Sequence, residues 1–134
     1  MSDNTANWRL EPLDSNVLAM PSIWKKKKLM QFCHYTFPDY PDGGLRLSAM
    51  DLALFMKAFM NYDESMLDSS TISEMMKVQT LQGVVGKDQG LIWYYKQLKG
   101  RRLIGHNGAE MGINTEMFFD PQTQVGVVML SNGG

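Results

Sequence analysis

The chain has 134 residues, of which 44% are hydrophobic and 20% are charged, a balance that is typical of a single folded domain and excludes a disordered segment. Its formal net charge of -1 attracts neither nucleic acid nor an anionic membrane, so neither is expected as a partner. Cys33 is the only cysteine, which excludes an intrachain disulfide and a thiolate metal cluster, and no metal or cofactor is expected. Without a secretory leader or a long apolar run, the sequence predicts a soluble protein, cytoplasmic as written.

The first segment, residues 1–47, is expected to form an irregular arm, because its hydrophobic periodicity is weak and it contains four of the five prolines. It also contains the run Lys25-Lys26-Lys27-Lys28, which is typical of a solvated face and is too short to indicate a nucleic-acid site. The arm ends over residues 37–44, where prolines and paired glycines favour turns. Residues 48–134 are expected to form one α+β domain.

Two helices are predicted after the arm. The first covers residues 48–61, because Ser48 is a favourable N-cap and Asp51 can face both the cap and the helix dipole. The second covers residues 70–78 and is capped by Ser69, Ser70 or Thr71, with Thr71-x-x-Glu74 as the best capping box. Apolar residues at helical spacing define the inner faces: Leu52, Phe55, Met56 and Phe59 in the first helix, and Ile72, Met75 and Met76 in the second.

From residue 91 onward the pattern changes to strands, which are expected to begin near residues 91, 102, 113 and 124, the second of them ending at His106. Short turns join them, so the sequence predicts an antiparallel sheet of about four strands with two helices on one face. The last strand, residues 125–130, is apolar on both faces, which is typical of a strand covered on both sides of its sheet. Because two short helices cover only one face, we expect a homo-oligomer, most simply a two-fold dimer.

Several motifs occur in a particular order along the chain. Gly43-Gly44-x-x-x-Ser48-x-x-Asp51-Leu52 opens the first helix, Gly90-Leu91-Ile92-Trp93 opens the sheet, and Gly105-His106-Asn107-Gly108-Ala109 precedes the last hairpin and Ser131-Asn132. Thr5-x-x-Trp8 and Leu18-Ala19-Met20-Pro21 come before them. In this order and spacing, the motifs resemble the C-terminal half of the serine β-lactamase-like family, which includes penicillin-binding proteins, D-alanyl-D-alanine peptidases, class C β-lactamases and related esterases. The resemblance implies a partial β-lactamase-like fold.

The resemblance also assigns roles to the third of these motifs. His106-Asn107-Gly108 is similar to the family's third motif, written Lys-Thr/Ser-Gly in most members and His-x-Gly in others. It implies a strand that borders the active site, where the backbone N–H of Ala109 supplies one oxyanion-hole donor and Gly108 lets the substrate approach closely. His106 is then expected to assist at the substrate carboxylate or carbonyl.

Two other matches to catalytic motifs are attributed to chance. Ser22-Ile23-Trp24-Lys25 fits Ser-x-x-Lys, and Ser2-Asp3-Asn4 fits Ser-x-Asn, but they stand in the wrong order for the family. A catalytic lysine lies one helical turn after its serine in a buried setting, whereas Lys25 opens a lysine run in the arm. Cys33 and His34 are not expected to pair either, because neighbours on an extended segment point to opposite faces.

The sequence therefore predicts a truncated serine β-lactamase-like protein. It keeps a vestigial third motif, at His106, Asn107, Gly108 and Ala109, lacks the Ser-x-x-Lys nucleophile and is expected to be inactive as a serine hydrolase on its own. Two alternatives remain open. The chain is a binding or assembly module that uses its sheet as an interface, or it is a serine hydrolase that a separate, complementing chain completes in trans.

Overall fold

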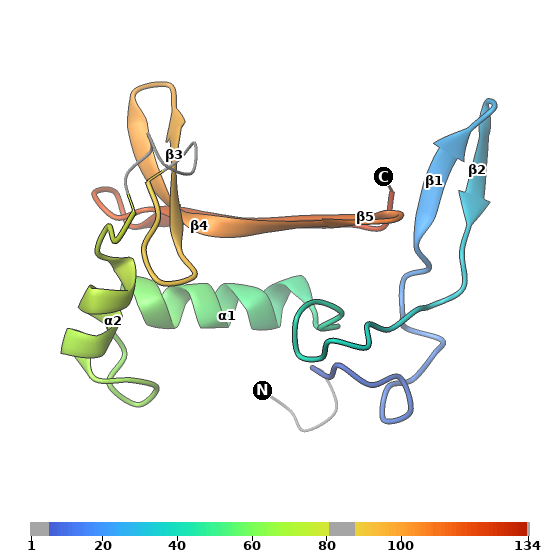
Figure 1. The fold of residues 1–134 in the computed structure, drawn as a ribbon, viewed down its shortest axis with the longest axis horizontal. Coiled ribbons are helices and arrows are strands. Elements are labelled where there is room, and N and C mark those ends of the chain that lie inside the picture. The colour runs from blue at the N-terminus through green and yellow to red at the C-terminus, as the bar shows by residue number, and fades with distance from the viewer. Residues whose placement is uncertain (1–5, 81–87, 134) are drawn as a thin grey trace. The chain divides into compact units, whose positions relative to one another are not determined.

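The computed structural model describes residues 6–80 and 88–133 (Figure 1). The chain divides into two compact units: unit 1 is Met1–Leu52, Gly108–Thr115 and Met129–Gly134, and unit 2 is Ala53–Asn107 and Glu116–Val128. Each unit is described on its own. In chain order the elements are β1 (Ser22–Lys25), β2 (Lys28–Gln31), α1 (Ala49–Met60), α2 (Ser69–Met76), β3 (Tyr94–Leu98), β4 (Arg101–Glu110), β5 (Ile113–Asp120) and β6 (Val125–Ser131).

The main sheet has the strand order β3-β4-β5-β6, so every strand pairs with its neighbour in sequence. β3 and β4 are antiparallel, from Tyr94 opposite Gly105 to Leu98 opposite Arg101. The turn between them is Lys99-Gly100, and both residues have the positive φ that a tight hairpin turn requires. With two helices in the described residues, the α+β class and the four-stranded antiparallel sheet are confirmed.

Two strand boundaries differ from the prediction. β3 begins at Tyr94 and not at residue 91, because Ile92 has a φ of 63° and the Gly90 N–H donates to the Trp93 carbonyl at 2.7 Å. Left-handed backbone is rare for a β-branched residue and is not expected from the sequence. The apolar run Leu91-Ile92-Trp93 was therefore wrongly predicted to be part of a strand. β4 in turn continues past His106 to Glu110.

The core of unit 2 is aromatic. Phe59 and Trp93 are 2% and 1% exposed, and their ring centroids lie 4.7 Å apart. Phe119 of β5 meets the edge of Trp93 at 6.2 Å, which fixes α1 against the sheet within this unit. Gly126 of β6 belongs to the same packing, because a Cβ there would lie 2.4 Å from the Met56 side chain.

Of the two helix caps, one was predicted correctly. At the start of α1 the Ser48 hydroxyl accepts the Asp51 N–H at 3.0 Å and donates to the Asp51 carboxylate at 2.8 Å, which confirms the predicted cap. The predicted cap of α2 is wrong: Asp68 is the N-cap, without a side-chain hydrogen bond to the helix. The helix ends at Met76 because Lys77 turns to extended backbone, with ψ 136°.

Within the described residues β6 has one uncovered face, which agrees with the expectation that the two helices cover only one face of the sheet. Val125, Val127 and Met129 alternate along the strand and are 61%, 53% and 57% exposed. Gly126 and Val128, which point to the opposite face, are half-buried. β6 is also an edge strand of the described sheet. One face of the strand is therefore apolar and open.

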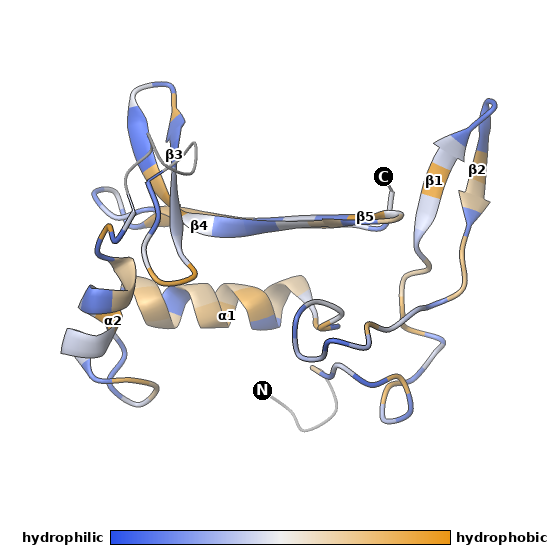
Figure 2. Cartoon of the chain, viewed as in Figure 1, coloured by the Kyte–Doolittle hydropathy of each residue, from blue (hydrophilic) through white to orange (hydrophobic). Residues whose placement is uncertain are grey.

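Unit 1 contains a regular element in the segment predicted to be irregular. β1 and β2 form an antiparallel hairpin in which Trp24 is opposite Leu29 and Lys25 is opposite Lys28. Figure 2 shows apolar residues within its strands and hydrophilic residues at its turn. The base of the hairpin is tied to the end of the chain, since the Ser22 N–H donates to the Asn132 carbonyl at 2.8 Å. In the part of the chain described, no helix has the length and apolar character needed to cross a membrane.

Candidate functional site

The residues that the sequence singled out occupy the second half of β4. The pairing of β4 with β3 ends at Gly105, opposite Tyr94. All five residues from His106 to Glu110 are exposed, and they continue beyond the first residue of β3. In this segment β4 pairs with no strand on its β3 side among the described residues, so its backbone groups there are accessible to a bound molecule.

The first two motif residues are ordered by a tyrosine of β3. The ring of Tyr94 lies edge-on to the His106 imidazole, with centroids 5.3 Å apart, and the Tyr94 hydroxyl donates to the Asn107 side-chain oxygen. Burial raises the pKa of the Tyr94 hydroxyl, the nearby Glu116 carboxylate raises it further, and a hydrogen bond with the Asn107 backbone opposes both. The hydroxyl therefore stays a proton donor near neutral pH and fixes the orientation of the Asn107 amide, while the exposed His106 ring is accessible to solvent.

The glycine of the motif is required by its cross-strand neighbour. The Thr115 hydroxyl donates to the Gly108 carbonyl at 3.4 Å, and a Cβ on residue 108 would lie only 2.8 Å from that hydroxyl oxygen. From the sequence, Gly108 was expected to let a substrate approach the strand closely. The structure adds a packing reason that applies whether or not a substrate binds.

Gly108, Ala109 and Glu110 also border a cavity of about 850 Å³ within unit 1. Its volume is in the range of small-molecule sites. The arm and the ends of β5 and β6 supply the rest of its wall, which is largely apolar: Leu13, Val17, Leu18, Phe37, Leu45 and Leu130 are among the lining residues. The backbone that follows the motif histidine thus faces a space large enough for a ligand.

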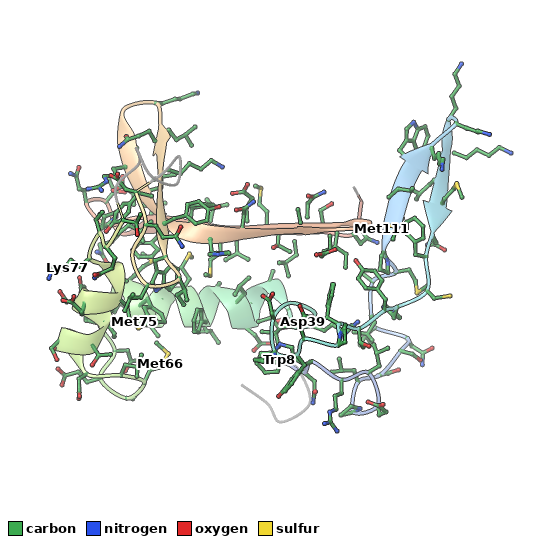
Figure 3. All side chains as sticks on the ribbon, viewed as in Figure 1. Trp8, Asp39, Met66, Met75, Lys77 and Met111 are labelled. Atoms are coloured by element: carbon green, nitrogen blue, oxygen red, sulfur yellow. The ribbon has the colours of Figure 1, made fainter. Side chains whose placement is uncertain are left out.

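Polar groups from the arm reach the same cavity. His34 lines it, and its Nε2 atom is buried without a hydrogen-bond partner among the described residues. The Tyr35 hydroxyl donates to the carbonyl of Met111, which lies at the β4–β5 turn (Figure 3). Burial raises the pKa of Tyr35, Glu110 adds to this rise and Arg46 opposes it. The sequence did not indicate a functional role for His34, because only a pairing with its neighbour Cys33 could be judged from it.

Arg46 has a structural part in this wall. Its guanidinium donates to the backbone carbonyls of Trp8 at 3.1 Å, Gly44 at 2.9 Å and Tyr35 at 2.5 Å, which joins three parts of the arm. Burial lowers the pKa of Arg46, but an arginine keeps its charge under such conditions. Because the guanidinium N–H groups donate to backbone carbonyls, the Arg46 side chain holds parts of the arm together and is not an anion-binding group.

The geometry rejects the Ser-x-x-Lys match. Ser22 and Lys25 are the first and last residues of strand β1, where side chains three positions apart point to opposite faces. Ser22 is 3% exposed, and its hydroxyl donates to the Asn132 carbonyl at 2.5 Å. The match Ser2-Asp3-Asn4 and Thr5 of the Thr5-x-x-Trp8 motif lie outside the described residues. Cys33 is exposed.

Among residues 6–80 and 88–133, His, Cys, Asp and Glu side chains form no group of three or more that is arranged to hold a metal ion.

Comparison with known proteins identifies a family and a similar solved structure. A family model described as Beta-lactamase matches residues 3–134. Among solved structures, an octameric penicillin-binding protein homologue from Pyrococcus abyssi is similar, with a TM-score of 0.77 and 26% sequence identity. That alignment covers 96% of this chain but 30% of the other, so the present chain spans less than a third of the length of that protein. None of the curated proteins matches.

Proposed function

The chain belongs to the β-lactamase family, and from this premise we propose that residues 106–109 form the substrate-side strand of a serine-hydrolase site that these 134 residues do not complete. The proposal depends mainly on one observation. The pairing of β4 with β3 ends at Gly105, and residues 106–109, which resemble the family's third motif, are exposed on the remainder of the strand.

The expected chemistry is acyl transfer. In such a reaction a serine oxygen attacks a carbonyl carbon, and backbone N–H groups stabilise the negative charge that develops on the carbonyl oxygen. The Ala109 N–H is the proposed donor from this chain, and the cavity beside it accommodates an apolar part of the substrate. The exposed His106 ring is positioned by Tyr94 to hydrogen-bond a carboxylate or carbonyl of the substrate.

The nucleophile is the component that we expect these residues to lack. Ser22 of the only Ser-x-x-Lys match within the described residues is buried in a strand, so its hydroxyl cannot be activated by Lys25. One oxyanion donor and a histidine do not form an acyl-enzyme. We therefore propose that residues 1–134 alone do not hydrolyse β-lactams or esters, and that a serine from additional protein segments, in the same or another polypeptide, is needed.

The proposal is tested by combining turnover and binding. The purified chain is incubated with a chromogenic β-lactam and with a p-nitrophenyl ester, and no rate above buffer is expected. Nuclear magnetic resonance of the labelled chain then follows amide shifts as a penicillin is added. Shifts at His106 and Ala109, with none at Gln97 of β3, support the substrate-side strand. Steady turnover, or shifts confined to other residues, contradicts the proposal.

A second candidate function is assembly. Val125, Val127 and Met129 form an exposed apolar row on an edge strand, and such rows are buried in stable proteins by a partner. The similar Pyrococcus abyssi protein is described as octameric. We propose that this face of β6 is an interface with a second copy of the chain, most simply in a two-fold dimer.

A further inference from the structure

The β1–β2 hairpin carries an unusual turn. Lys26 and Lys27 occupy it with φ values of 50° and 62°, so both have left-handed backbone. Hairpin turns of this kind favour Asn-Gly or Asp-Gly, because a side chain with a full-length stem is disfavoured at positive φ. The β3–β4 hairpin of the same chain has glycine in its turn, at Gly100. The Lys-Lys turn is thus unfavourable for local folding, and strained positions of this kind are often functional.

The positive charges around this turn also disfavour folding of the hairpin. Lys25 lies directly opposite Lys28, and like charges at opposed positions destabilise a hairpin. In the described part of the chain, no ion pair involves any lysine from 25 to 28. The β3–β4 hairpin is also basic but differs, because three of its four basic residues have a carboxylate partner: Lys96 with Glu116 at 3.3 Å, Arg101 with Asp120 at 3.1 Å and Arg102 with Asp88 at 2.7 Å.

Apolar side chains accompany the unpaired lysines. Trp24, Leu29 and Met30 are 69%, 58% and 46% exposed. Trp24 is opposite Leu29, and Ile23 is opposite Met30, so the two pairs lie on opposite faces of the ribbon. Figure 3 shows long, nitrogen-tipped side chains extending from the end of the hairpin. A single docked protein surface would cover one face, whereas the interface of a bilayer surrounds a hairpin that settles into it.

We propose that the β1–β2 hairpin binds anionic phospholipid surfaces, with Lys25–Lys28 at the phosphate groups and Trp24 and Leu29 in the interfacial layer. Lysine is a mobile point charge that suits a diffuse layer of phosphates, and it is depleted at protein–protein interfaces. Tryptophan favours the membrane–water interface because its ring is apolar and its N–H is polar.

The dimensions of the hairpin agree with this assignment. Trp24 lies two residues behind the turn, or roughly 7 Å at the usual rise of a strand. A lysine stem is long enough to keep its amine at the phosphates while the strand lies along the surface. The net charge of -1, from which no membrane partner was expected, does not describe this local charge, because charges are screened beyond about 8 Å at physiological salt.

The test is vesicle co-sedimentation of the purified chain. Vesicles of phosphatidylcholine with about a third phosphatidylglycerol are expected to bind it at low salt and to release it as salt is raised, whereas pure phosphatidylcholine vesicles bind little. The decisive variant combines Lys26→Asn with Lys27→Gly, which removes two charges and installs a favourable turn. We expect it to be at least as stable to urea as the parent chain and to bind anionic vesicles at least tenfold more weakly.

Two further variants separate the contribution of Trp24 to vesicle binding from that of basic residues in general. Trp24→Ala is expected to weaken vesicle binding severalfold with less effect on its salt dependence, and the control Lys96→Gln/Lys99→Gln, in the other basic hairpin, is expected to bind like the parent. Unchanged binding of Lys26→Asn/Lys27→Gly, equal loss in the control, or no preference for anionic vesicles overturns the proposal. Tighter binding to heparin or RNA than to anionic vesicles also overturns it and assigns the lysines to a polyanion.

Discussion

At the scale of single residues, Ser22 and His106 have opposite environments. Ser22 is 3% exposed and bonded to the end of the chain, while His106 is exposed on β4. Ser22→Ala is therefore expected to remove a structural hydrogen bond and lower the free energy of unfolding by about 1 kcal/mol. Urea unfolding measures this change. Ser15→Ala, in an exposed position of the arm, is the matched control and is expected to have no measurable effect.

Gly108 provides a second test at this scale. A Cβ on residue 108 would meet the Thr115 hydroxyl oxygen at 2.8 Å, so Gly108→Ala is expected to destabilise the chain by about 1 kcal/mol through overpacking. Thr115→Ala removes that oxygen, and the double variant is expected to recover most of the loss. A double variant as unstable as the sum of the single ones would show that another contact requires glycine.

The Asp120 carboxylate gives a prediction about pH. Backbone N–H groups of Gln122 and Thr123 and the Arg101 guanidinium hold its pKa below the usual 3.8. A depressed pKa in the folded state stabilises the fold above the unfolded value of 3.8, and this contribution is lost as pH falls through the lower folded pKa. Asp120→Asn is expected to lower stability at pH 7 and to flatten the decline below about pH 4. Urea midpoints between pH 2.5 and 7 measure both effects.

At the scale of elements, α1 contributes Met56 and Phe59 to the core of unit 2. Phe59, which is 2% exposed, contacts Phe55 and Trp93. Phe59→Ala is expected to destabilise the chain by about 3–5 kcal/mol, because it opens a cavity among aromatic rings. Leu54→Ala, on the 50%-exposed side of the same helix, is expected to cost less than 1 kcal/mol. Equal losses in thermal or urea unfolding would contradict the packing of α1.

The helices and the main sheet could be predicted because their local signals agree with the fold. Ser48 and Asp51 form the cap that their spacing indicates, and alternating residues with short turns predict the hairpins. The β1–β2 hairpin was missed because its turn is Lys26-Lys27, without the glycine or asparagine that normally identifies a tight turn. Asp68 was overlooked as the cap of α2 because three hydroxyl residues follow it.

The sequence could predict which residues form the candidate site, but not their surroundings in three dimensions. The order of the motifs identified residues 106–109, but the register that ends at Gly105 depends on the turn at Ile92, which the sequence does not indicate. The cavity is formed by segments far apart in sequence, such as Leu18, Phe37 and Leu130. Contacts of this kind are not encoded in local periodicity, so neither the cavity nor the buried nitrogen of His34 could be expected.

At the scale of the whole molecule, β6 presents an open apolar face at the edge of the described sheet. Val127 and Met129 are more than half exposed on an edge strand, and we propose that a second copy covers them. The variant Val127→Lys/Met129→Lys is expected to shift the chain from a discrete oligomer toward monomer in light scattering. Gln97→Lys, which adds charge to an exposed position of β3, is the control and is expected to leave the oligomer intact. A monomeric parent chain at micromolar concentration would contradict this interface.

We propose that this chain of the β-lactamase family carries the substrate-side strand of the site but no activated serine among its described residues. Intact mass spectrometry after incubation with a fluorophosphonate, and separately with a penicillin, tests it most directly. We expect an unmodified mass under conditions that fully label a control serine hydrolase. A stoichiometric adduct on any serine, and on Ser22 in particular, would contradict it.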